Sequence, residues 1–223
     1  MLERILEKEG MMNPQEVKEY NLLSRRYLTR LGYDKVINSL YNSGRLEGKV
    51  IDLGTGSGWL AIELAKRNRD YQIVGVDLSQ EMLTLAKQNV STSLNNYSNL
   101  SFIKSDVKSL PFKDDSFDVA VSYASLHHWG GNLLEIFEEI QRVVKNDGLV
   151  IIHDLKRDEK NLLFLKTIPS KIMRKLLEAS VMASYIPSEI REILRRDPIT
   201  SQWQAIESTM GLGIEGRVKK RRI

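Results

Sequence analysis

The sequence predicts a doubly wound α/β domain built around a mostly parallel sheet. Short apolar runs alternate with amphipathic helical segments, and a glycine-rich loop follows the first of these runs. The chain has 223 residues, of which 42% are hydrophobic, and this suffices for one domain with a sizeable core. Right-handed crossovers between successive strands then give a parallel sheet covered on both faces.

The N-terminal region is expected to be helical. Residues 1–9 mix charges in a helical pattern and lack the apolar core of a signal peptide. Residues 14–43 carry apolar side chains at three- and four-residue steps, and Gly32 is expected to divide them into two helices. The aromatic residues of this region fit either a lid or core positions: Tyr20, Tyr27 and Tyr33.

The central region alternates strands and helices. Strands are expected over 49–53, 72–76, 100–105, 117–121 and 149–152, and helices over 58–67, 80–90 and 131–145. Ser and Asn are frequent in residues 91–99, which predicts a surface loop, and Asp147 with Gly148 predicts a turn into the fifth strand.

The C-terminal region is expected to be helical first and then to form a hairpin. A helical stretch over 159–184 is broken near Pro169, and Pro187 suits the first turn of a helix over 187–196. Residues 203–219 are expected to form a closing hairpin, with Gly211–Gly213 between its two strands.

The glycine loop after the first strand suggests a nucleoside cofactor. The order Gly54-x-Gly56-x-Gly58 differs from the G-x-G-x-x-G fingerprint of dinucleotide sites, because Trp59 stands where the third glycine belongs. No Lys-Ser or Lys-Thr pair follows, so the phosphate-loop pattern is also missing. Asp52 would repel a diphosphate, and therefore suits a cationic ligand without phosphate.

The stretch from Asp52 to Gly58 resembles the first motif of class I S-adenosylmethionine-dependent methyltransferases. Three further motifs of this family follow in the expected order: Asp77 after the second strand, Asp106-Val107 after the third, and the Leu-Pro-Phe and Asp-Ser-Phe-Asp stretches over 110–118. The resemblance implies a seven-stranded sheet ending in an antiparallel hairpin. It also implies a single domain, divided into an N-terminal helical cap (1–45), a cofactor-binding core (46–155), a helical acceptor cap (156–200), and the hairpin with a basic tail (201–223).

The resemblance also implies which residues contact S-adenosylmethionine. An acidic residue about 20 positions beyond a glycine loop typically binds ribose hydroxyls, and Asp77 is placed for this role. Asp106 would bind the adenine amine and the backbone N–H of Val107 a ring nitrogen, with the backbone of 122–123 near the methionine end. The implied cofactor residues are Asp52, Gly54, Thr55, Gly56, Asp77, Leu78, Met82, Asp106, Val107 and Ser122.

The segment after the fourth strand is the expected acceptor side. Ser122-Tyr123-Ala124-Ser125 differs from the Asn/Asp-Pro-Pro-Tyr/Phe motif of many amide and amino methyltransferases, whereas Leu126-His127-His128 is similar to the small-molecule branch that includes quinone-biosynthesis enzymes. His128 is the candidate general base, since imidazole titrates near neutral pH, and His127 is expected to be packed and hydrogen-bonded.

No metal is expected here, because two adjacent histidines should point in different directions and no spaced carboxylates accompany them. Asp154, after the fifth strand, is expected to cap a loop or to pair with Lys156 or Arg157.

Charge and composition bear on partners. The net charge of +4 belongs to the tail, since 217–223 hold five basic residues and the rest of the chain sums to −1. A small-molecule acceptor is therefore favoured. The alternatives are an RNA methyltransferase that uses the tail and a cofactor-binding protein without catalysis, and an NAD oxidoreductase fits least. The chain has no cysteine and no apolar run of ~20 residues, which favours a cytoplasmic protein without membrane insertion.

Overall fold

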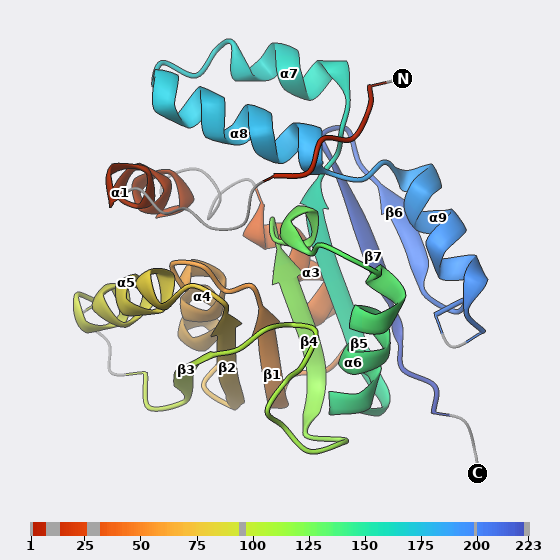
Figure 1. Ribbon diagram of the computed structural model, residues 1–223. Coiled ribbons are helices and arrows are strands. Elements are labelled where there is room, and N and C mark those ends of the chain that lie inside the picture. Colours follow the sequence, from red (N-terminus) through yellow and green to blue (C-terminus); the bar gives the residue numbers. More distant parts are fainter. Residues whose placement is uncertain (1, 8–13, 26–31, 94–96, 199, 221–223) are drawn as a thin grey trace.

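A computed structural model describes residues 2–7, 14–25, 32–93, 97–198 and 200–220. Its centre is a seven-stranded sheet of order β3-β2-β1-β4-β5-β7-β6 (Figure 1). Strand β7 runs antiparallel to both of its neighbours, β5 and β6, whereas the other neighbouring strands pair in parallel. This confirms the predicted fold class. The strands are β1 Gly48–Leu53, β2 Tyr71–Asp77, β3 Leu100–Lys104, β4 Phe117–Tyr123, β5 Val144–Leu155, β6 Gln204–Glu207 and β7 Gly211–Arg217.

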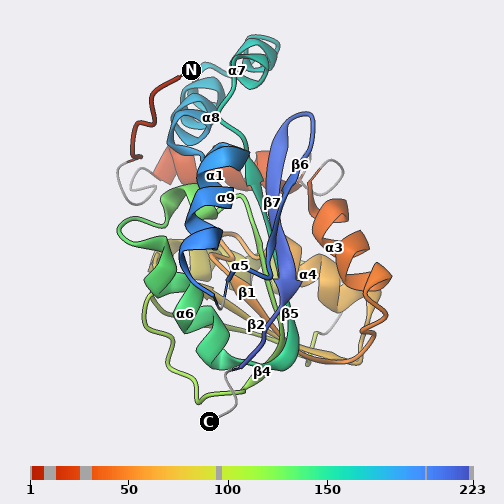
Figure 2. The ribbon, with the colours of Figure 1, turned by 90° about the vertical axis from the view of Figure 1, so that its right-hand side faces the viewer.

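Helices cover both faces of the sheet (Figure 2). One face carries α3 (Tyr33–Asn42), α4 (Trp59–Arg67) and α5 (Gln80–Ser91), and the other carries α6 (Leu133–Val143) and α9 (Pro187–Arg196). Successive strand residues point to opposite faces, so Val50 joins the core with α3 and α4 while Ile51 joins the core with α6 and α9. Burial on both faces explains the nearly continuous apolar strands.

A cap lies above the C-terminal ends of the parallel strands (Figure 1). It consists of α1 (Pro14–Leu23), α7 (Glu159–Leu165), α8 (Lys171–Ala183) and the N-terminal segment 2–7. The backbone N–H of Ile5 donates to Met182 O at 3.0 Å, and Arg4 Nε donates to Ala183 O at 2.6 Å. These hydrogen bonds hold segment 2–7 against the C-terminal end of α8.

Several elements differ from the sequence-based expectation. Segment 2–7 is extended rather than helical, and it pairs with α8 instead of forming its own hydrogen bonds. Helices α3 and α9, which fall within the ranges expected for the caps, pack on the sheet faces. Strand β5 is longer than 149–152, since it pairs with β4 on one side and with β7 on the other.

The hairpin glycines also lie elsewhere than expected. Gly211–Gly213 begin β7 instead of forming the turn, which spans 208–210. A Cβ at Gly211 would stand 2.7 Å from Asp154 O, and one at Gly213 would stand 2.9 Å from His153 Cε1. Close strand packing, not turn geometry, therefore requires glycine here. None of the helices in the described residues is long and apolar enough to cross a bilayer.

Gly58 and Gly44 offer a matched pair for testing the packing of the glycine loop. Both have left-handed backbones, with φ of +80° and +75°. A Cβ at Gly58 would stand 2.9 Å from both Ala86 Cβ and Phe102 Cζ, whereas nothing lies within 4 Å of one at Gly44. We expect Gly44→Ala to lower the free energy of unfolding by about 1–2 kcal/mol, the backbone cost alone. Gly58→Ala should lose a further ~1–3 kcal/mol from overpacking, as measured by denaturant unfolding. Equal losses in the two variants would contradict this packing.

Candidate cofactor and acceptor site

The glycine loop connects β1 to α4 in a series of left-handed residues. Gly54, Gly56 and Gly58 have φ values of +67°, +53° and +80°, which non-glycine residues adopt at a cost. Gly54 also packs directly against the segment after β4, since a Cβ there would overlap the hydroxyl of Ser125. The loop thus presents bare backbone at the C-terminal edge of the sheet, where such folds bind ligands.

Asp52 and Thr55 form a buried pair beneath this loop. The Thr55 hydroxyl donates to Asp52 Oδ2 at 2.6 Å, and the Thr55 backbone N–H donates to Val76 O at 2.9 Å. Burial raises the pKa of Asp52 to about 7, although the hydrogen bond from Thr55 opposes the shift. Asp52 therefore stabilises the turn, and a nearby cation would favour its ionised form.

Asp77, at the end of β2, faces the same loop. Its Oδ2 accepts the backbone N–H of Gly56 at 2.8 Å, and its Oδ1 accepts that of Ser79 at 2.9 Å. Burial raises the pKa of Asp77 despite these bonds. Ser79 caps α5 by accepting the N–H of Met82 at 3.2 Å. The carboxylate is thereby held still at the point where a ribose is expected.

The other predicted cofactor residues differ in what they expose. Asp106 and Val107 follow β3, and Asp106 Oδ1 accepts the backbone N–H of Lys108 at 2.9 Å. Leu78 is 52% exposed beside Asp77, whereas the side chain of Met82 is buried against the sheet. Their contacts with the cofactor stay predictions.

Ser122 is joined to the strand beside it. Its hydroxyl, fully buried, donates to Leu53 O at 2.7 Å. The Ser122 side chain therefore links β4 to β1, which leaves its backbone for the predicted contact.

Helix α1 closes over the glycine loop through polar contacts that the sequence did not reveal. Asn21 Oδ1 accepts the indole N–H of Trp59 at 2.8 Å and the amide of Asn89 at 2.9 Å. Asn89 in turn donates to Ser57 O at 2.9 Å. The ring of Tyr20 lies against Gly56, since a Cβ there would be 3.8 Å from it. A polar residue on a helix, such as Asn21, does not reveal from the sequence which distant residue it will contact.

Tyr33 and Tyr123 meet under the cap. Tyr33 stacks edge-on against Tyr123, with ring centroids 5.2 Å apart. The third tyrosine considered for a lid, Tyr27, lies outside the described residues.

His127 and His128 form a cluster with Glu7 and Asp154. The backbone N–H of His127 donates to Asp154 Oδ2 at 2.7 Å, and His127 Nδ1 lies 2.9 Å from the Asp154 carboxylate. Glu7 Oε2 lies 3.7 Å from His127 Nε2 and 3.7 Å from His128 Nδ1. The two rings lie side by side, 4.1 Å between centroids, and so do not diverge as the sequence suggested.

Asp154 accepts the backbone N–H of Leu155 at 2.7 Å, which fits the expected cap, but its side-chain partner is not the expected Lys156 or Arg157. It binds His127, whereas Lys156 pairs with Asp158 and Glu207, and Arg157 pairs with Glu189.

The surroundings of the two histidines shift their pKa values in opposite directions. Burial opposes a charge on His127, but the Asp154 carboxylate outweighs it and raises the pKa of this ring. Burial and the neighbouring His127 lower the pKa of His128 to about 3. This shift disfavours His128 as a general base, and its catalytic role stays a prediction. Burial also raises the pKa of Glu7, which the sequence did not bring to this site.

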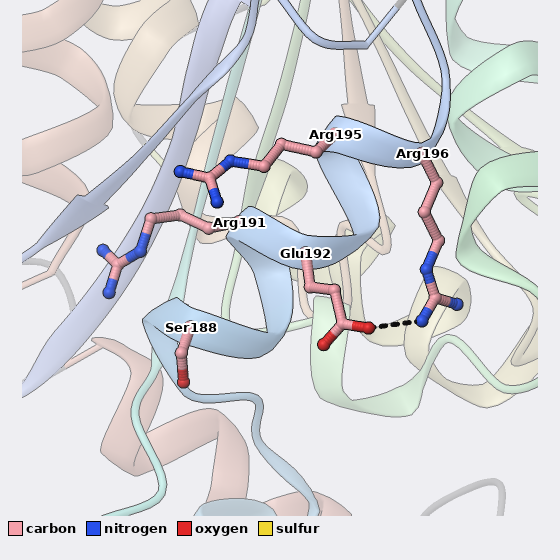
Figure 3. A pocket seen from close by; sticks show the side chains of 5 residues that line it. All are labelled: Ser188, Arg191, Glu192, Arg195 and Arg196. Carbon is pink, nitrogen blue, oxygen red and sulfur yellow. Dashed lines mark hydrogen bonds and ion pairs between the residues drawn. The ribbon is translucent and has the colours of Figure 1, made fainter.

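A separate hollow lies on the outer surface of α9 (Figure 3). It is lined by Ser188, Arg191, Glu192, Arg195 and Arg196, of which Arg196 pairs with Glu192 at 2.5 Å. This hollow is open and contains none of the predicted site residues. It does not account for cofactor or acceptor binding.

Comparison with known proteins finds similarity to methyltransferases. The model of a methyltransferase domain matches residues 51–152, which contain the glycine loop, Asp77, Asp106 and the histidines. This central segment, a little under half of the chain, is therefore similar to methyltransferase domains. It is 28% identical to the ubiquinone/menaquinone biosynthesis C-methyltransferase UbiE of Citrifermentans bemidjiense over 208 residues, which cover 87% of this chain and 83% of that protein.

Other methyltransferases match over shorter stretches or in fold alone. The release factor glutamine methyltransferase of Lactococcus lactis is 35% identical over 109 residues, or 46% of this chain, and the match spans only 38% of that protein. The crystal structure of a SAM-dependent methyltransferase from Aquifex aeolicus has a TM-score of 0.67 and 20% identity, with 93% of this chain and 99% of that one covered. That likeness concerns the fold.

The raised pKa of Asp52 predicts a pH-dependent stability of the ligand-free protein. The folded state holds this proton more tightly than the unfolded chain, so the stability that Asp52 contributes is complete below its ordinary pKa and is lost as the pH rises to about 7. Relative to Asp52→Asn, the unmodified protein should lose on the order of 3 kcal/mol of unfolding free energy between pH 5 and pH 8. Denaturant unfolding at both pH values measures this change. A difference between the two proteins that is independent of pH would contradict the assignment.

Proposed function

We propose that this protein transfers the methyl group of S-adenosylmethionine to a small-molecule acceptor. The observation that carries the proposal is the glycine loop held between two carboxylates, the buried Asp52 beneath it and the partly buried Asp77 beside it. Such a loop suits a nucleoside with a positive sulfonium and no phosphates. The family match over residues 51–152 supports the same cofactor.

In this proposal the protein mainly binds, aligns and excludes water. The methyl group leaves an already activated sulfonium in an in-line displacement, and correct alignment can supply several kcal/mol of the barrier. Asp77 accepts hydrogen bonds from the ribose hydroxyls, and Asp106 with Val107 positions the adenine. The backbone of Ser122 and Tyr123 lies near the methionine end. The pair formed by the buried Tyr33 and the partly buried Tyr123 helps to keep water out of this end of the site.

A base is needed only if the acceptor must lose a proton first. The sequence suggested His128, whose low pKa makes it a poor proton acceptor. His127 is better placed, because Asp154 fixes its ring through Nδ1 and leaves Nε2 for another partner. We therefore assign the positioning of the acceptor's reactive atom to the His127–Asp154 pair, acting directly or through a group bound at Nε2.

A small-molecule acceptor is supported by two observations. The long match to UbiE concerns a quinone C-methyltransferase and includes segments on both sides of the core. The described part of the basic tail is occupied by ion pairs: Lys219 and Arg217 pair with Asp147, and Lys220 pairs with Asp115. This compensation of charge weakens the RNA alternative.

The arrangement of the chain completes the proposal. We propose a single methyltransferase domain, with the cap of α1, α7, α8 and segment 2–7 over the acceptor. A cytoplasmic location stays a prediction from composition.

Titration calorimetry with S-adenosylhomocysteine tests the cofactor site. Asp77→Asn keeps the size of the side chain but removes the carboxylate charge that strengthens hydrogen bonds from two ribose hydroxyls. This variant should bind S-adenosylhomocysteine about 10- to 100-fold more weakly, a loss of ~1.5–3 kcal/mol. Asp70→Ala is the matched control, since Asp70 is exposed just before β2, at its opposite end. Equal affinities for the unmodified protein and Asp77→Asn would contradict the assignment.

Transfer of a labelled methyl group to fractions of cell extract tests the acceptor class. We expect label in the small-molecule fraction. Label in RNA, with an affinity that falls steeply with salt and depends on Lys219 and Lys220, would instead favour the RNA alternative. A protein that binds the cofactor and labels no fraction would support the alternative without catalysis.

A further inference from the structure

We propose that Glu7, His127 and His128 form a binding site for a divalent transition-metal ion of the zinc type. Each residue offers one donor atom, and the donor atoms lie within 4.8 Å of one another. The three residues come from segment 2–7 and from the short 3-10 helix Leu126–His128 that follows β4. None of the contacts proposed for S-adenosylmethionine requires these three residues to lie together.

The spacing of the donor atoms fits coordination better than direct hydrogen bonding. Glu7 Oε2 is 3.7 Å from His127 Nε2 and 3.7 Å from His128 Nδ1. Hydrogen bonds between such groups are about 2.7–3.2 Å long. Tetrahedral zinc with bonds of about 2.0–2.1 Å separates its ligand atoms by roughly 3.4 Å. The two distances from Glu7 are therefore within a few tenths of an ångström of this separation, and the two imidazole nitrogens lie within 4.8 Å of each other.

A buried atom without a partner points into the cluster. The side chain of His127 is 2% exposed, and its Nε2 has no hydrogen-bond partner among the described residues. Such a buried nitrogen is costly unless something binds it. Asp154 already holds the other ring nitrogen, Nδ1, at 2.9 Å. A carboxylate on the far nitrogen is the usual second-shell support of a metal-binding histidine.

The surrounding charges are compatible with a cation. Glu7 and Asp154 supply two carboxylates next to the rings. Arg4 is a positive group close enough to act on His127, and it opposes a cation. Its guanidinium is engaged elsewhere, however, 3.7 Å over the ring of Tyr185 and bonded to Ala183 O.

The donor set indicates the class of metal. Two imidazoles and a carboxylate suit zinc and its first-row neighbours, whereas magnesium and calcium prefer oxygen ligands throughout. Three protein ligands leave one position open, as in catalytic zinc sites. If the proposed function holds, an acceptor oxygen filling this position would become more acidic, which favours hydroxyl-bearing acceptors. The site itself does not depend on that function.

This inference revises the expectation that no metal binds. Adjacent histidines diverge in a strand, but the 3-10 turn brings their rings together. The carboxylate comes from a residue 120 positions earlier, which spacing rules do not detect.

Metal titration of chelator-treated protein tests the site without the methyl cofactor. We expect one Zn²⁺ per chain by calorimetry, and a tetrahedral visible spectrum when Co²⁺ replaces it. Glu7→Gln and His128→Gln should each weaken Zn²⁺ binding by at least about 100-fold, and Asp154→Asn, which changes only the supporting shell, by about 10- to 100-fold. Glu3→Gln is the matched control, because Glu3 lies exposed on the same segment, and it should bind as the unmodified protein does.

Two results would overturn the proposal. One is the absence of stoichiometric Zn²⁺ or Co²⁺ binding to the unmodified protein. The other is equal affinity in the unmodified protein, Glu7→Gln and His128→Gln, with thermal unfolding used to confirm that each variant is folded. S-adenosylhomocysteine titration of the same chelator-treated sample keeps failure of the metal site distinct from failure of the methyltransferase proposal.

Discussion

The geometry of the cofactor region depends on the Asp77 carboxylate. One of its oxygens accepts the backbone N–H of Gly56 and the other that of Ser79, so the end of β2 fixes both the glycine loop and the start of α5. Burial makes this carboxylate costly to ionise, and its bonds to the two backbone donors offset part of that cost. A ligand that brings hydroxyl donors and a positive charge would complete the compensation, whereas a pyrophosphate would oppose it.

The cap extends this arrangement to the acceptor. Asn21 on α1 reaches Trp59 at the start of α4, and Ser170 at the N-terminus of α8 donates to Glu19 at 2.8 Å. Segment 2–7 then carries Glu7 to the histidines that follow β4. Three segments far apart in the sequence thus meet above the strand ends. The core supplies cofactor chemistry common to the fold, and the cap supplies the groups that can distinguish one acceptor from another.

Local patterns predicted the elements, but long-range contacts did not follow from them. Apolar periodicity located β1 to β4 to within a few residues, whereas the length of β5 and the position of the hairpin turn depend on the pairing of β5 and β6 with β7. The left-handed glycines and the Ser79 cap also follow from local backbone chemistry. In contrast, the role of Glu7 depends on the path of an extended segment along α8. Asp154 was expected to pair with its neighbours in sequence, yet its partner lies 27 residues earlier at the end of the adjacent strand.

A crystal structure of the protein with S-adenosylhomocysteine bound would test the cofactor site most directly. The ribose hydroxyls should lie within hydrogen-bond distance of Asp77, with the adenine beside Asp106 and the thioether toward Tyr123 and the histidines. A ligand bound away from the glycine loop, or a loop that holds phosphate groups instead, would contradict the central claim that the Asp52 and Asp77 carboxylates select a phosphate-free, cationic nucleoside.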